Sequence, residues 1–190
     1  FVSGQEVVAG CVSKHVWSSW QRSRRHGVEP ATRLAPISVT GDGLEQLRLR
    51  NQMLMAAAKG LFMTTAHLLA RSGSIMLLTD AQGVVLEMAG DQATMAAARD
   101  IRLIACAAAP VFMPGTDQIL GVVDISCPPA SYQVNNLALA VASARQIEAV
   151  LAERISQEHR RLLEACLQMR GRADSQALLA LDRKACLVHS

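Results

Sequence analysis

The stretch from Ala105 to Ser126, ACAAAPVFMPGTDQILGVVDIS, decides the fold that this sequence predicts. It contains two apolar runs, Ala105 to Phe112 and Gln118 to Ser126, with Pro114-Gly115 between them. Apolar runs of this length on either side of a Pro-Gly turn are typical of two antiparallel strands. Nothing in the stretch indicates a catalytic group.

Further strands and several helices are predicted around this strand pair. The apolar spacing predicts helices over residues 5–25, 44–70, 93–100 and 134–170, and a second strand pair over residues 74–80 and 84–88. Strands that are close in sequence and joined by short turns favour an antiparallel sheet. We therefore expect an α+β fold, in which an antiparallel sheet is flanked by helices and followed by a long C-terminal helix.

Composition limits the classes of function. The chain has 190 residues, 51% of them hydrophobic and 3% aromatic, with a formal net charge of +3, which predicts a globular core and no strong attraction to nucleic acid. No apolar run is long enough to cross a membrane. The five cysteines are scattered and the histidines share no ligand spacing, so we expect no disulfide framework, no metal site and a cytoplasmic location.

The long predicted helix outruns the sheet that it follows. Its length is roughly 50 Å at 1.5 Å per residue. One stripe along it is apolar: Leu137, Val141, Ala144, Ile147, Leu151, Ile155, Leu162, Cys166 and Met169. The far half of the helix must pack on something outside its own domain, and we expect that half to pair with a second copy of the chain, forming a homodimer. The alternative is a bent helix that lies wholly on its own sheet.

Three segments resemble the GAF sensory region of sigma-54-dependent transcription activators of the acetoin catabolism regulator type. They are Ser19-Trp20-Gln21-Arg22-Ser23 with Gly27-Val28-Glu29-Pro30 behind it, the run Leu77 to Leu86, and the run Cys106 to Ser126. The resemblance implies an N-terminal helix and linker (1–43), a GAF-like domain (44–133), a signalling helix (134–171) and the start of a PAS domain (172–190). A long family segment has no counterpart near residue 104, and we expect that it is unobserved rather than deleted.

The resemblance also implies a ligand pocket on one sheet face. The candidate ligand-binding residues are Thr79, Glu87, Cys106, Ala108, Val122 and Asp124. Each polar candidate has a plainer interpretation beside this one. Cys106 suits a small core residue, Asp124 a structural carboxylate that accepts backbone N–H groups, and Glu87 a solvated residue on an edge strand.

The function implied is that of the N-terminal sensor of such an activator, so the resemblance implies binding rather than enzymatic turnover. It would bind a small-molecule effector, without a cofactor, and control a downstream ATPase. This fragment itself contains neither a Gly-Lys-Ser/Thr phosphate loop nor a helix-turn-helix pattern, so we expect it to make no nucleic acid contact. The full-length protein would bind DNA and RNA polymerase holoenzyme. Two alternatives are a GAF-type module that docks a metabolic enzyme subunit without a small ligand, and a thiol or redox sensor that uses Cys106 or Cys127.

Overall fold

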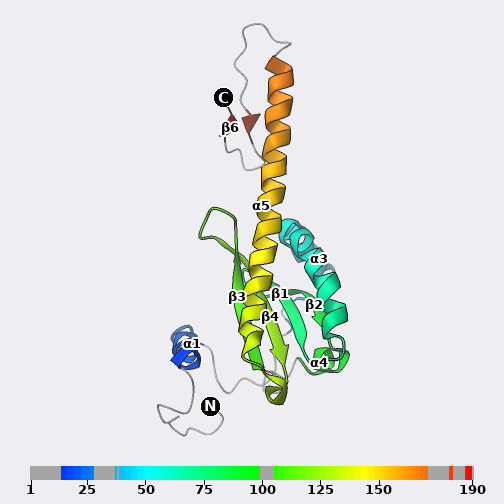
Figure 1. Ribbon diagram of the computed structural model, residues 1–190, viewed down its shortest axis with the longest axis vertical. Helices are drawn as coiled ribbons and strands as arrows, with labels where there is room; N and C mark the ends of the chain where they lie inside the picture. The colour runs from blue at the N-terminus through cyan, green and yellow to red at the C-terminus, as the bar shows by residue number, and fades with distance from the viewer. Residues whose placement is uncertain are drawn as a thin grey trace.

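An antiparallel sheet of four strands forms the centre of the molecule (Figure 1). The computed structural model describes residues 14–27, 37, 39–98, 105–170, 180–181 and 187–189. The strands are β1 (Ile75–Asp80), β2 (Val85–Gly90), β3 (Ala105–Phe112) and β4 (Ile119–Cys127), in the order β2-β1-β4-β3. The α+β fold and both predicted strand pairs are confirmed. The segment near residue 104 lies outside the described residues.

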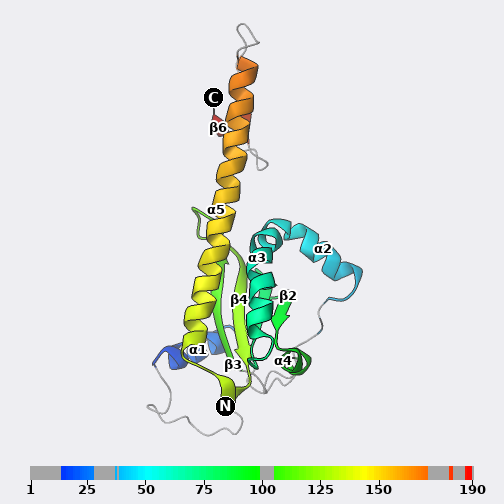
Figure 2. The same ribbon diagram turned by 45° about the vertical axis from the view of Figure 1, so that its right-hand side comes forward.

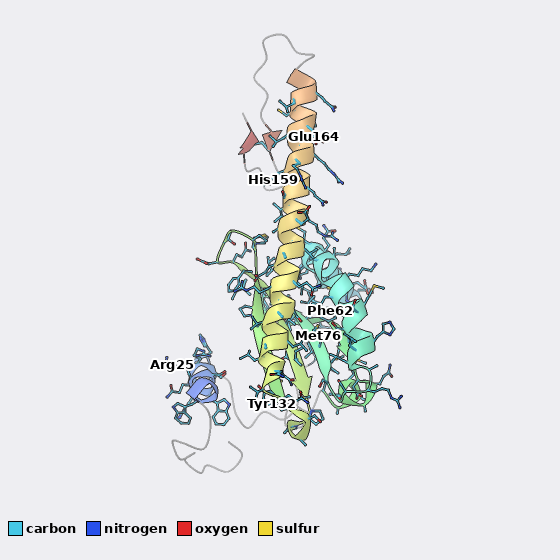
Figure 3. All side chains as sticks on the ribbon, in the orientation of Figure 1. Arg25, Phe62, Met76, Tyr132, His159 and Glu164 are labelled. Carbon is cyan, nitrogen blue, oxygen red and sulfur yellow. The ribbon has the colours of Figure 1, made fainter. Side chains whose placement is uncertain are left out.

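Two helices cover one face of the sheet, as Figures 1 and 2 show. These are α3 (Gln52–Leu69) and α5 (Asn135–Arg170). Figure 3 places Phe62 of α3 and Met76 of β1 where the helix meets the sheet. The core between the layers consists of Leu54, Ala57, Ala58, Phe62, Met76, Leu78, Leu86, Ala109, Val111, Val123, Ile125, Ala140, Ala144, Ile147 and Leu151. Its side chains are mostly aliphatic, and they include the larger Phe62 and Met76.

Strand alternation gives the sheet two different faces. Successive side chains of a strand point to opposite sides. On β3, Ala107, Ala109 and Val111 are buried toward the helices, whereas Cys106, Ala108 and Pro110 are exposed. We call the face under α3 and α5 the helix face. The opposite one is called the second face, and its residues include Leu77, Thr79, Cys106, Ala108, Val122, Asp124 and Ser126.

The single helix predicted over residues 44–70 is interrupted, so that prediction was wrong. The structure has α2 (Asp42–Arg50) and α3, with Asn51 between them at φ −97° and ψ 21°. The Leu47 carbonyl oxygen accepts both the backbone N–H of Asn51, at 3.0 Å, and its side-chain amide, at 2.9 Å. No residue of α2 is fully buried, so packing does not hold the two helices in line.

The other predicted helices are present. They are α1 (Lys14–Arg25), α4 (Gln92–Ala97) and α5, with a short 3-10 turn at Pro129–Ser131. The part of the first helix predicted before residue 14 lies outside the described residues. The part of the predicted α5 stripe that lies over the sheet is confirmed only in part, because Leu137 and Val141 are 48% and 43% exposed. The stripe residues Ala144, Ile147 and Leu151 belong to the core between α5 and the sheet, as does Ala140, which the predicted stripe did not include.

Beyond the sheet, α5 continues as an unbroken helix (Figure 1). His159 and Glu164, labelled in Figure 3, lie on this part. Beside it lies an antiparallel pair of short strands, β5 (Ala180–Leu181) and β6 (Leu187–His189), within the segment 172–190 for which the resemblance implied the start of a PAS domain. The PAS assignment and the domain boundaries stay predictions. Among the described helices, none has the length and apolar character that a bilayer crossing requires.

The turn between β1 and β2 is fixed by the side chain of Asp80. Its Oδ1 accepts the backbone N–H of Gln82 at 3.0 Å and of Val84 at 2.8 Å, and Gly83 adopts a φ of +83°. The pattern Asp-x-x-Gly over residues 80–83 therefore stabilises the turn. Its carboxylate accepts two backbone N–H groups, and its glycine adopts the left-handed conformation.

We expect Asp80→Ala to lower the free energy of unfolding by about 1–3 kcal/mol, because two amides near the buried end of β1 lose their acceptor. Asp117→Ala, in the turn between β3 and β4, is the matched control, because that side chain is exposed. Urea unfolding of both variants measures the difference. Equal losses of stability would contradict the role assigned to Asp80.

Candidate functional site

All but one of the candidate ligand-binding residues lie on the second face. In the register of the sheet, Thr79 is opposite Val122, and Ala108 is opposite Asp124. Cys106 is opposite Ser126, one step further along the same two strands. Side chains of directly opposite residues share a face and lie side by side. The structure thus brings together Thr79, Cys106, Ala108, Val122 and Asp124 over three neighbouring strands.

Three polar side chains at this place form a hydrogen-bonded chain. The Ser126 hydroxyl donates to Asp124 Oδ2, and the Cys106 sulfur lies 3.1 Å from the Ser126 oxygen. Since the hydroxyl proton of Ser126 points to Asp124, the Cys106 thiol is the donor in the second bond. Ser126 was not among the predicted site residues. Its position two residues after Asp124, on the same side of β4, is the signal that was available.

Asp124 is a buried carboxylate with one free oxygen. Only 9% of the residue is exposed, and Oδ1 has no hydrogen-bond partner among the described residues. Burial raises the pKa of the Asp124 carboxyl, while the hydrogen bond from Ser126 lowers it in part. The interpretation of Asp124 as an acceptor of backbone N–H groups was wrong, because its partner is a side-chain hydroxyl. A buried acceptor without a donor is unusual and calls for an explanation.

Cys106 is held in the protonated form. Its side chain remains accessible to solvent on β3, yet the surrounding protein atoms desolvate the sulfur, and Asp124 adds negative charge. Together these effects raise the pKa of the thiol to about 11. The pKa of Cys127 is also raised, mainly by burial. Because the thiolate is the reactive form, both environments disfavour a redox-sensing role at neutral pH.

Glu87 lies away from the other candidates. It pairs with Leu78 in the register and therefore points to the helix face. There it lines a groove of about 650 Å³ between α2, α3 and β2. Its Oε2 lies 3.9 Å from Arg48 Nη2, and Arg48 Nε donates to the Leu86 carbonyl oxygen at 2.9 Å. As expected, Glu87 is partly solvated on an outer strand of the described sheet, but it belongs to no common site with Asp124.

The raised pKa of Asp124 predicts a pH dependence of stability. A carboxyl whose pKa is higher in the folded than in the unfolded protein binds protons more tightly when folded. Stability is therefore greatest below the unfolded pKa and falls as the pH rises through the folded pKa. Asp124→Asn removes this fall, so we expect the variant to be more stable than wild type at pH 7. Thermal unfolding between about pH 3 and pH 8, a range that begins below the unfolded aspartate pKa of roughly 3.9, measures the difference. Parallel curves for both proteins would contradict it.

Fold and site together define an α+β domain of GAF-like arrangement, with helices on one sheet face, a polar cluster on the other and a long C-terminal helix. The structure is similar to DhaR(N) in the crystal structure of the E. coli DhaR(N)–DhaL complex. The TM-score is 0.67 and the identity 16%, over 87% of this chain and 69% of that chain, so the likeness establishes the fold. No protein-family model and no curated protein matches the sequence.

Proposed function

We propose that this chain is the sensory region of a sigma-54-dependent transcription activator, and that its second face receives a small effector. The observation that carries the proposal is the free Oδ1 of Asp124, a buried acceptor with no donor among the described residues. A ligand hydroxyl would supply that donor. The fold likeness to DhaR(N) supports the sensory assignment.

The chemistry of the face favours an uncharged ligand. Ser126 holds Oδ2 of Asp124 and so leaves Oδ1 for the ligand. Ala108 and Val122 flank the carboxylate and offer apolar contact to a short carbon chain. The described residues of the second face include no Lys, Arg or His that would neutralise a carboxylate or phosphate. Binding sites of this kind combine an apolar surface with a few placed polar groups.

Calorimetric titration with short uncharged diols and ketols tests the proposal. We expect saturable heat with the wild-type chain and at least a tenfold weaker affinity for Asp124→Asn, roughly the effect of one lost charged hydrogen bond. The matched control is Asp117→Asn, which changes an exposed aspartate in the turn between β3 and β4. Absence of binding by any of these compounds, or equal binding by both variants, would contradict the proposal.

A second candidate function is protein docking, in which the domain binds a metabolic enzyme subunit. It is favoured by the fold neighbour, which was crystallised as a complex with the protein DhaL. Sedimentation of the chain mixed with a purified DhaL-type protein distinguishes the two candidates. If the chain forms a stable complex and shows no heat of binding in the diol titrations, its ligand is a protein and not a small effector.

The proposed output of the sensor is a paired α5. Beyond the sheet this helix exposes Leu167, 59% accessible, and carries the partly buried Ile155 and Leu162. Pairing with α5 of a second copy would cover these residues and connect the sensor to a downstream ATPase. Sedimentation equilibrium of the chain tests this proposal, and a monomer at high concentration would contradict it.

A further inference from the structure

An irregularity at the end of β3 leaves a backbone group to be satisfied by α5. Val111 is opposite Gly121, but the next residue, Phe112, is opposite Ile119, so the register of β3 and β4 shifts between them. Such a bulge removes a regular ladder hydrogen bond. The Phe112 N–H donates instead to Oε1 of Glu148 on α5, at 2.9 Å. A side chain of the long helix thus completes the edge of the sheet.

Glu148 connects this point to the surface of the helix. Its side chain is 14% exposed, and its second oxygen, Oε2, accepts a hydrogen bond from Arg145 at 2.6 Å. Arg145 itself is 68% exposed. Both residues line a cleft of about 520 Å³ between α5 and the turn that follows Phe112. One oxygen of Glu148 therefore holds the strand while the other is held by its own helix.

The same strand carries part of the proposed effector site. Cys106 and Ala108 of β3 lie on the second face, and Ala109 and Val111 pack toward α5 on the helix face. A displacement of β3 caused by a ligand would reach α5 by two routes, apolar packing and the bond from Phe112 to Glu148. Apolar contacts have no directional preference, whereas a hydrogen bond to a carboxylate is short and directional.

We infer that Glu148 is the positioning residue through which β3 and α5 move together, so that occupancy of the second face is transmitted to the long helix. The inference rests on the proposed function for the origin of the signal. The bond between Phe112 and Glu148 is itself independent of any ligand. Arg145 restricts the Glu148 side chain and keeps Oε1 directed at the strand.

The first measurement is amide hydrogen exchange of Phe112 by NMR on the full chain. In Glu148→Ala we expect exchange to be about fivefold to tenfold faster, the effect of one lost hydrogen bond. Glu148→Gln keeps a carbonyl oxygen in place and is expected to stay close to wild type. Glu153→Ala, which removes an exposed acid from the same helix, is the matched control. An unchanged Phe112 rate in Glu148→Ala would overturn the contact.

The second measurement tests transmission without a ligand. Ala108→Phe places a ring on the second face at β3, where it takes the place of a bound ligand. We expect it to change exchange of the α5 amides beyond Leu151 by about fivefold, the lower end of typical coupling between sites. In a Glu148→Ala background the same ring should leave those amides unchanged, and Glu148→Gln should restore the response.

An α5 response that persists without Glu148 would assign transmission to packing and overturn the inference. So would the absence of any α5 response to Ala108→Phe in the wild-type background. If only the proposed function is wrong, the diol titrations show no heat of binding, while both hydrogen-exchange results are as expected.

Discussion

Gly121→Ala is expected to lower the free energy of unfolding by about 3 kcal/mol, more than most single substitutions in this chain. A Cβ atom at this position would lie 2.1 Å from the Thr79 carbonyl oxygen and 2.8 Å from Leu54 Cδ2. The first of these atoms belongs to the backbone of β1, which is paired on both sides and cannot move away. Urea unfolding followed by circular dichroism measures the loss.

Gly60→Ala is the matched control for this prediction. Gly60 lies on α3, and a Cβ there meets no atom within 4 Å. Because glycine weakens a helix relative to alanine, we expect this variant to be more stable than wild type by about 1 kcal/mol. The same chemical change then has opposite signs at two sites. Destabilisation of equal size at both would show that the close contact at Gly121 has been misplaced.

Ile147→Ala is expected to cost about 2–5 kcal/mol, the usual range for emptying a buried aliphatic position. Ile147 has no exposed surface and belongs to the core between α5 and the sheet. Thermal unfolding at low protein concentration measures the effect. A loss below about 1 kcal/mol would mean that α5 is not anchored at this point.

Leu167→Ala removes a side chain of comparable size from the part of α5 that lies beyond the sheet. Since Leu167 is 59% exposed, we expect a change within about 0.5 kcal/mol for the protomer. If α5 pairs with a second copy, the concentration dependence of unfolding should weaken in this variant. An identical concentration dependence in wild type and variant would exclude Leu167 from the proposed pairing.

The sheet could be predicted because its sequence signals are local. The Pro-Gly turn, the Asp-x-x-Gly turn and the apolar runs beside them are complete within short segments. The break at Asn51 could not be predicted, since the apolar pattern runs on through it and only the backbone angles of Asn51 show it. The apolar stripe of α5 was right at Ala144, Ile147 and Leu151, but it included the exposed Leu137 and Val141 and missed the buried Ala140.

The candidate site could be predicted from the sequence where the side chains of a strand alternate regularly between the two faces of the sheet. Asp124 and Val122 share a face by counting along β4, and the resemblance marked Cys106 as a candidate within the predicted strand Ala105 to Phe112. Glu87 was placed wrongly because the register shifts between Leu78 and Thr79, so that Thr79 is opposite Val85 while Leu78 is opposite Glu87. One extra residue reverses the orientation of all that follow it. Sequence spacing contains no sign of such a shift.

Because α5 is a continuous helix that extends beyond the sheet, a small tilt at the sheet is amplified at its C-terminal end. From Leu151, where contact with the core ends, to Arg170 the helix extends for about 28 Å at 1.5 Å per residue. A tilt of about 5° at the sheet would swing the distal end sideways by about 2.5 Å on that geometry. A small rotation of α5 against the strands would thus displace the C-terminal end of the helix, and any segment attached to it, by a few ångströms.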